Sequence, residues 1–290
     1  MTKNTNIMLN GVMGVITGDA LGCPVQFMSR EEVAKKPVTG MRGYGTFDLP
    51  EGSWTDDSSL TLALLESINR KEGVDLDDIM VNFMKWLHEG EFTPYGYSYD
   101  IGNGSLMRIL PVCIYSSEMK SKGEFTDSDA IKTVHAVGSL THAHIRSNIA
   151  CGLYFFMVHQ ILTGNGSLKE RLQEGLTQGF AFYELFLTDK ENLHFYDRLR
   201  DLSAFAATSV DRIRSSGYVV DTLEAAVWSL ITTDSFESAL LKAVNLGEDT
   251  DTVGAVAGGL GGLFYGYDAS PEDWLAAIKR REWIEEMCGG

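Results

Sequence analysis

Two short clusters of carboxylates and hydroxyls could bind metal ions in this chain of 290 residues. The TDD cluster consists of Thr55, Asp56 and Asp57, and the DTDT cluster consists of Asp249, Asp251 and Thr252. Their four carboxylates can share a small site only if cations neutralise the charge. Two divalent ions would balance it, and oxygen ligands suit Mg²⁺, Mn²⁺ or Ca²⁺ better than zinc. Such a pair of ions can orient a diol or a water.

Each cluster taken alone also fits an ordinary helix N-cap. Threonine and aspartate are preferred cap residues, and acids in the first turn suit the helix dipole. The metal hypothesis depends on the pair, and it requires that the two clusters meet in space. The sequence leaves that step open, so both interpretations stand.

Glycines recur at helical spacing in two segments of the chain. The first set consists of Gly11, Gly14, Gly18 and Gly22, and the second consists of Gly254, Gly258, Gly262 and Gly266. Spacings of three to four residues put each set on one helix face. Because glycine costs about 1 kcal/mol relative to alanine inside a helix, such a stripe needs a compensating contact. We expect two helices that cross tightly and hold the aspartates rigidly; unrelated loop glycines are the alternative.

The 3.6-residue period recurs along the chain, whereas strict alternation is scarce. Helices are expected in 127–140, 144–164, 166–186, 221–233, 234–247 and 270–287. Most of these segments start with a capping residue, such as Ser167, Asp221, Asp234 or Ser270. No linker rich in proline, glycine or serine divides the chain. We therefore predict an all-α protein of roughly ten helices, folded as one compact domain over residues 1–290.

The composition excludes several classes of function. Lys and Arg number 24 against 40 Asp and Glu, and the formal net charge of -16 repels nucleic acid and anionic membranes. The four cysteines form no CxxC pair, which fits buried thiols in a reducing compartment. We find no signal peptide and no apolar run of the roughly 20 residues that a membrane span needs. We expect a cytoplasmic protein that binds neither nucleic acid nor a membrane.

A glycine-containing loop in the segment YDIGNGSLMR could hold a diphosphate. The backbone amides of Gly102, Asn103, Gly104 and Ser105 stand before a predicted helix, SLMRILPV, whose N-terminus would favour an anion. An ordinary helix N-cap with a glycine turn fits the same residues. Neither a GxGxxG nor a Walker A motif occurs.

Six segments in a fixed order carry a family resemblance: GDALGCPVQF, GSWTDDSSLTLALLESI, YDIGNGSLMRILPV, LTHAHIRSNIACGLYF, GYVVDTLEAAVW and GEDTDTVGAVAGGLGG. Together they resemble the ADP-ribosylglycohydrolase family, and more nearly its bacterial branch, the dinitrogenase reductase-activating glycohydrolases. The resemblance implies a compact all-α domain with a binuclear Mg²⁺ or Mn²⁺ centre in a cleft. It also implies a hydrolase that removes ADP-ribose from the arginine of a modified protein and releases free ADP-ribose.

The resemblance also implies roles for individual residues. The metal ligands would be Thr55, Asp56, Asp57, Asp249, Asp251 and Thr252. The ADP-ribose-binding loop would comprise Gly102, Asn103, Gly104, Ser105 and Met107. Asp57 and Asp100 are the expected catalytic residues, with Asp100 as the acid–base or ribose-handling group; a solvated loop aspartate is the alternative.

Three further residues are expected near the site. The resemblance places His142 beside the substrate together with Thr141, although a structural histidine fits equally well. Tyr218 is expected to stack on the adenine, with burial in the core as the alternative. Asp19 is expected to support the TDD cluster without binding metal.

One position departs from the family pattern. Family members often carry glutamate in the segment that reads PVQF here, and Gln26 cannot transfer a proton. Asp100, Glu31 or Glu32 would then do the proton chemistry, or the activity would be reduced or altered. The rival functions are hydrolysis of another linkage, such as serine-linked ADP-ribose or O-acetyl-ADP-ribose, and ADP-ribose binding without catalysis. Gln26 favours the binding role, whereas the intact ligand set favours the enzyme.

Overall fold

The computed structural model describes residues 6–94, 103–188 and 190–289. These residues form helices and no strand, which confirms the all-α class. The α-helices are α1 (Ile7–Gly22), α2 (Arg30–Lys35), α3 (Asp56–Lys71), α4 (Leu76–Glu89), α5 (Leu110–Ser121), α6 (Asp127–Ser139), α7 (Ile145–Thr163), α8 (Leu168–Phe186), α9 (Leu202–Ala206), α10 (Val219–Ile231), α11 (Phe236–Val244), α12 (Thr250–Tyr265), α13 (Glu272–Ala277) and α14 (Arg281–Met287). Short 3₁₀ helices are η1 (Cys23–Val25), η2 (His194–Arg200), η3 (Val210–Arg212) and η4 (Tyr267–Ala269).

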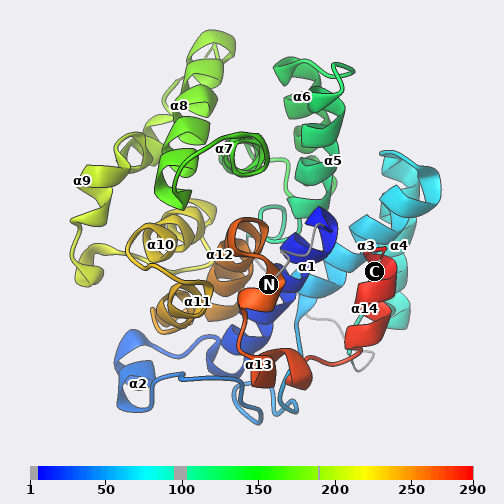
Figure 1. Ribbon diagram of the computed structural model, residues 1–290. Helices are drawn as coiled ribbons and strands as arrows, with labels where there is room; N and C mark the ends of the chain where they lie inside the picture. The colour runs from blue at the N-terminus through cyan, green and yellow to red at the C-terminus, as the bar shows by residue number, and fades with distance from the viewer. Residues whose placement is uncertain (1–5, 95–102, 189, 290) are drawn as a thin grey trace.

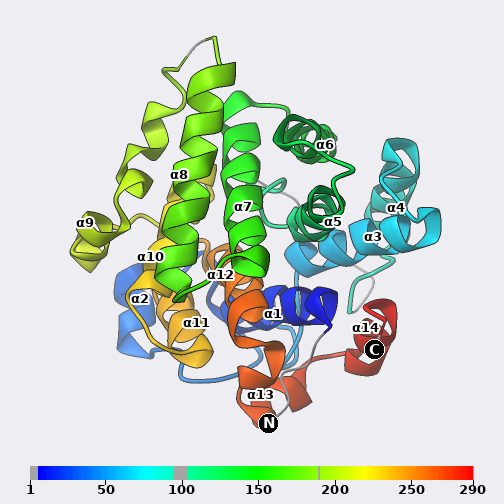
Figure 2. The same ribbon diagram turned by 45° about the horizontal axis from the view of Figure 1, so that its top comes forward.

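Two glycine-rich helices, α1 and α12, cross antiparallel at the centre of the molecule (Figures 1 and 2). A Cβ added at Gly14 would lie 2.1 Å from the carbonyl oxygen of Gly258, and one added at Gly18 would lie 2.0 Å from that of Gly254. No side chain fits between backbones this close. The predicted tight crossing is therefore confirmed, and its dispersion contacts and weak Cα–H···O contacts offset the helix propensity lost at each glycine.

Gly11 and Gly266, at one end of the two predicted stripes, do not join the crossing. A Cβ added at Gly11 would meet leucine side chains at 3.0 Å rather than a backbone, and Gly266 ends α12 with a φ of 86°. At the end that matters for the site, Gly22 packs on Asp251, and an added Cβ would lie 2.4 Å from the Asp251 Cα. The crossing thus fixes the backbone from which the Asp251 side chain projects.

The substitution Gly18→Ala tests the crossing. The added methyl group meets the Gly254 carbonyl, which is backbone and cannot rotate away. We expect the free energy of unfolding to fall by about 3 kcal/mol, measured by urea unfolding. Gly73→Ala is the control, because its Cβ would find its nearest neighbour, the Tyr115 hydroxyl, at an ordinary 3.6 Å. Equal effects of the two substitutions would refute the close approach.

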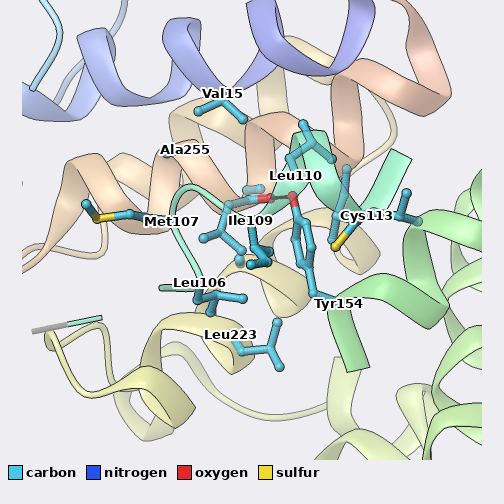
Figure 3. Close-up of a cluster of buried hydrophobic side chains, with 14 of the residues drawn as sticks. Val15, Leu106, Met107, Ile109, Leu110, Cys113, Tyr154, Leu223 and Ala255 are labelled. Atoms are coloured by element: carbon cyan, nitrogen blue, oxygen red, sulfur yellow. Dashed lines mark hydrogen bonds between the residues drawn. The ribbon is translucent and has the colours of Figure 1, made fainter. Parts of the chain in front are cut away.

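The remaining helices surround the central pair. α10 and α11 pack on α12, and α3 and α5 pack on α1. α7 contacts α12 and has α6 and α8 beside it (Figure 2). Figure 3 shows the apolar cluster where these helices meet the central pair. In it, the Tyr154 hydroxyl lies 3.3 Å from the Val256 carbonyl oxygen. The site described below lies at the edge of this core, where α3 and α12 begin.

The stretch Ile7–Val25, which comprises α1 and η1, has the length and apolar character of a membrane span. The prediction that no segment meets that test was therefore wrong. However, 89% of its most apolar window is buried inside the protein. Its apolar character is that of a core helix packed on α12.

Several helix boundaries differ from the prediction. The N-cap of α11 is Ser235 and not Asp234, and that of α13 is Pro271 and not Ser270. Segment 270–287 forms two helices, α13 and α14, because Arg280 between them takes a left-handed φ of 50°. α10 begins at Val219, so Asp221 lies inside the first turn, where an acid favours the dipole, rather than at the cap. The helix expected directly after Ser105 begins only at Leu110.

His135, which is half-buried, makes the fold sensitive to acid. Its ring stacks on Tyr183 with Nε2 at 2.7 Å from the hydroxyl, and burial lowers the pKa of His135 to about 4. Because the unfolded chain takes up this proton near pH 6.5, the free energy of unfolding falls as the pH drops from about 6.5 to about 4. We expect the wild type to lose about 2 kcal/mol more than His135→Gln between pH 7 and pH 5, as measured by urea unfolding. Parallel losses in both proteins would contradict this assignment.

Candidate functional site

The TDD and DTDT clusters meet where α3 and α12 begin. The hydroxyl of Thr55 lies 3.1 Å from Oδ2 of Asp57 and 3.3 Å from Oδ2 of Asp251. The contact between Thr55 and Asp251 joins residues that are 196 positions apart in the sequence. The step that the sequence left open, that the two clusters meet in space, is confirmed.

Simple helix capping does not account for the two clusters. Thr55 and Asp249 are the N-cap residues of α3 and α12, yet neither side chain accepts a hydrogen bond from an amide of its own helix in the described structure. The N-cap side chains of Asp75 in α4 and Ser167 in α8 do accept such bonds. The polar side chains at the starts of α3 and α12 instead face one another.

Asp19, buried in α1, supplies the missing cap of α3 from outside that helix. Its carboxylate accepts hydrogen bonds from the amides of Thr55 and Ser58, each at 3.0 Å, and from the Ser58 hydroxyl at 2.6 Å. Burial raises the pKa of Asp19 to about 6, and these donors oppose the rise because they stabilise the carboxylate. Asp19 thus fixes the backbone of Thr55, which is the supporting position expected for it.

Asp57 and Asp251 occupy an unfavourable environment for carboxylates. They are 1% and 0% exposed, and Oδ1 of each has no hydrogen-bond partner among the described residues. Burial raises the pKa of both well above the usual range, and repulsion from neighbouring acids, including Asp19 and Asp249, raises it further. Buried carboxylates in this state require a proton or a cation. The two unpartnered oxygens indicate a place for a cation.

The donor atoms fit a hard divalent cation, but they do not form a finished metal site. In the part of the chain that the structure describes, no three His, Cys, Asp or Glu side chains are placed to hold one ion. The available oxygens come from aspartates and threonine hydroxyls, the ligand type that Mg²⁺ and Mn²⁺ prefer. The donor chemistry therefore fits the ions, while the coordination by all six residues stays a prediction.

Asp249 is held by neutral donors. Nδ2 of Asn103 donates to its Oδ2 at 2.6 Å and also to the Thr222 hydroxyl at 2.9 Å. Nε2 of Gln26 and the Thr252 hydroxyl lie 3.4 Å and 3.3 Å from its Oδ1. Asn103 thereby ties the glycine loop to the DTDT cluster. Gln26 acts here as a hydrogen-bond donor, which a glutamate could do only when protonated.

The structure describes only part of the predicted ADP-ribose loop. Asp100 and Gly102 lie outside the described residues. Ser105 is fully buried, and Met107, 4% exposed, belongs to the apolar cluster of Figure 3 rather than to an open surface. Because α5 begins at Leu110, the loop amides are not at a helix N-terminus, and that part of the diphosphate argument was wrong.

Gly104 and His142 contact each other. A Cβ added at Gly104 would lie 2.6 Å from Cε1 of His142, so the ring sits directly on the loop backbone. Nδ1 of His142 lies 2.9 Å from the Thr141 hydroxyl, which accepts a hydrogen bond of 2.7 Å from Arg108. The fully buried Arg108 was missed by the sequence analysis. The only sequence feature that pointed to Arg108 was its position as a cation inside the apolar segment LMRILPV.

Tyr218 lies at the surface with 38% exposure, which rules out the alternative of burial in the core. Its hydroxyl lies 3.0 Å from Nη1 of Arg146, whose guanidinium stacks 3.6 Å from the ring centre of Phe195. Tyr218 and Phe195 line a cavity of about 570 Å³ together with Arg198 and Glu224. An exposed tyrosine beside a cavity is suited to stacking on a base, and adenine stacking stays a prediction.

Comparisons with known proteins agree with this architecture. A family model described as ADP-ribosylglycohydrolase matches residues 4–289. ADP-ribosylarginine hydrolase Tri1 of Serratia proteamaculans (strain 568) is 30% identical, over 96% of this chain and 76% of that protein. The ADP-ribosyl-[dinitrogen reductase] glycohydrolase of Rhodospirillum rubrum is 32% identical, over 93% of this chain and 89% of that protein.

The similarity extends to three-dimensional structure. A solved structure described as an ADP-ribosylglycohydrolase-related protein complex has a TM-score of 0.78 at 28% sequence identity. The alignment covers 99% of this chain and 97% of the other. The match therefore spans the whole domain and not an isolated motif.

Proposed function

This chain belongs to the ADP-ribosylglycohydrolase family and is a glycohydrolase, and we propose that it cleaves the N-glycosidic bond between ADP-ribose and an arginine of a modified protein. The observation that carries the proposal is the pair of buried, unpartnered oxygens of Asp57 and Asp251, brought together at Thr55. One relative is named a hydrolase of ADP-ribosylarginine, which supports the arginine linkage.

We assign two divalent ions, Mg²⁺ or Mn²⁺, to this site. The ligands would be Thr55, Asp56, Asp57, Asp249, Asp251 and Thr252. When bound, the ions supply binding places for the ribose hydroxyls and an ordered water. Asp19 acts behind them, because its bonds to the start of α3 hold the Thr55 backbone in place.

Residues around the loop would bind ADP-ribose itself. Asn103 fixes the loop to the DTDT cluster, so the substrate and the ligands share one rigid frame. Gly104 lets the loop backbone pack directly against His142, and Tyr218 offers an exposed ring for the adenine. Met107 supports the loop from the apolar side instead of touching solvent.

The proton chemistry falls to Asp100 in this proposal. Gln26 holds Asp249 through its amide, and a glutamate there would place another carboxylate in a cluster with excess negative charge. Glu32 is engaged elsewhere, because its carboxylate accepts hydrogen bonds from the amide and the hydroxyl of Ser29 at the start of α2. Asp100 would protonate the departing guanidine or accept a proton from the water.

The test is release of free ADP-ribose from a protein that carries mono-ADP-ribosylated arginine. We expect release with Mg²⁺ or Mn²⁺ and none with EDTA. A parallel panel of serine-linked ADP-ribose and O-acetyl-ADP-ribose checks the linkage. Faster turnover of another linkage would replace the arginine assignment, and unchanged release in EDTA would remove the metals from the proposal.

A further inference from the structure

Three exposed aromatic side chains lie on the segments beside the candidate site. Phe27, Tyr44 and Phe47 are 67%, 72% and 36% exposed. The rings of Phe27 and Phe47 pack edge to face, with 6.1 Å between centroids. We call these three residues the aromatic rim. Packing in the core does not explain three large rings exposed to water on a protein of net charge -16, so a binding role has to be considered.

The rim is attached directly to the DTDT cluster. Phe27 follows Gln26, whose amide contacts Asp249. The amide of Phe27 donates to the Glu248 carbonyl at 2.6 Å, and the amide of Glu248 donates to the Met28 carbonyl at 2.6 Å. The backbone of Phe27 therefore runs alongside the residue that precedes Asp249.

The segment that carries Tyr44 and Phe47 is fixed to the same place. The amide of Thr46 donates to the Pro24 carbonyl at 3.1 Å, and its hydroxyl donates to the Gln26 carbonyl at 2.7 Å. Gly45 packs so closely that an added Cβ would lie 1.8 Å from the Pro24 oxygen. The two rim segments form one unit at the edge of the site.

The backbone of this unit is strained. Of the seven non-glycine residues with positive φ in the described chain, four belong to it: Phe27 (67°), Tyr44 (58°), Asp48 (53°) and Glu248 (64°). Bulky residues rarely adopt this conformation, and such strain gathers at functional sites. Here it presents the Phe27 and Tyr44 rings to solvent instead of burying them.

The charges at the rim favour a cationic partner. Asp48 and Glu248 are exposed and adjoin Phe47 and the Phe27 backbone. The nearby cations Arg30 and Arg42 both donate to backbone carbonyls. Arg30 donates to those of residues 210, 213 and 246, and Arg42 donates to that of Lys36. Aromatic faces combined with carboxylates suit a guanidinium or a basic peptide through cation–π and ionic contacts.

We propose that the aromatic rim docks the polypeptide segment that flanks the ADP-ribosylated arginine. The inference rests on the proposed function and adds to it a specificity surface for the protein part of the substrate. The TDD and DTDT clusters and the loop then bind ADP-ribose, while the rim binds the protein that is released when the bond is cleaved. A substrate without that polypeptide should not bind to the rim, so the rim should not raise its kcat/KM.

The test compares kcat/KM on two substrates, an ADP-ribosylated arginine protein and ADP-ribosylated free arginine. We expect Phe47→Ala and the double variant Phe27→Ala/Phe47→Ala to lose about tenfold on the protein and less than about twofold on free arginine. Phe27→Tyr, which keeps the ring, should retain wild-type turnover on both. The control Phe186→Ala removes a ring that is 59% exposed at the end of α8, and both rates should be unchanged.

The outcomes separate the two proposals. No release by the wild type from either substrate would overturn the proposed function and the rim with it. Release by the wild type, with equal rates or equal losses on both substrates in the rim variants, would overturn the rim alone. Thermal unfolding of each variant identifies any loss that comes from misfolding, and Phe47→Ala has the further advantage that position 47 does not have a positive φ.

Discussion

Asp251→Asn is expected to abolish ADP-ribose release while making the metal-free protein more stable. The Asp251 side chain is fully buried, lies near Asp57 and Asp249, and has an unpartnered Oδ1. Asparagine keeps the shape and removes a buried charge, so the metal-free protein should gain roughly 2 kcal/mol. Loss of one of the proposed metal ligands should lower kcat/KM by about 10³-fold.

Thermal unfolding in EDTA and with saturating Mg²⁺ or Mn²⁺ measures both effects. The wild type should gain stability on adding metal, because an ion that binds only the folded state stabilises it. Asp251→Asn should start from a higher midpoint in EDTA and show little further shift. Asp234→Asn, an exposed aspartate before α11, is the control and should behave as the wild type does.

A lower midpoint for Asp251→Asn in EDTA would show that the carboxylate stabilises the fold and would remove the argument for a cation. A variant that kept its metal-induced shift would show that the ion binds elsewhere. The expected combination, gain of stability with loss of activity, is the pattern of a site held in the core for function.

Local features of this fold were predictable from the sequence. Ser167 caps α8 in a capping box with Glu170, and Gly164 ends α7, because these motifs depend on residues within one helical turn. The glycine stripes predicted the crossing of α1 and α12 for the same reason, since a period is a local property. By contrast, the left-handed Arg280 that separates α13 from α14 follows no local preference of arginine and was not predictable.

The site itself was predictable only in part. The TDD and DTDT clusters contain the residue types that the chemistry needs, but their meeting depends on how α1 positions both helix starts. The bond from Asn103 to Asp249 spans 146 positions, and no pattern around either residue indicates the partner. Arg108 was overlooked because a lone cation in an apolar segment has no unique structural meaning.

Asp19→Ala is expected to destabilise the protein strongly and to reduce activity, although Asp19 is not a predicted metal ligand. The substitution leaves the amides of Thr55 and Ser58 and the Ser58 hydroxyl without their acceptor in a buried place. Unsatisfied buried donors cost about 1–3 kcal/mol each, and relief of the buried charge of Asp19 offsets a part. We expect a net loss of about 3 kcal/mol in the free energy of unfolding.

The activity of the folded Asp19→Ala protein should fall about 10²-fold, because a small displacement of Thr55 misplaces the TDD cluster. The matched control is Asp75→Ala, which removes an ordinary N-cap of α4 that belongs to neither cluster and should cost about 1 kcal/mol with unchanged kcat/KM. Urea unfolding and ADP-ribose release under native conditions provide the two measurements. If both variants lost similar stability and both kept activity, α3 would be positioned by packing on α1 and not by the Asp19 carboxylate. If only Asp19→Ala lost activity, the hydrogen bonds from Asp19 to the start of α3 would be shown to position the TDD cluster. Those bonds would then connect the crossing of α1 and α12 to the geometry of the proposed ligands.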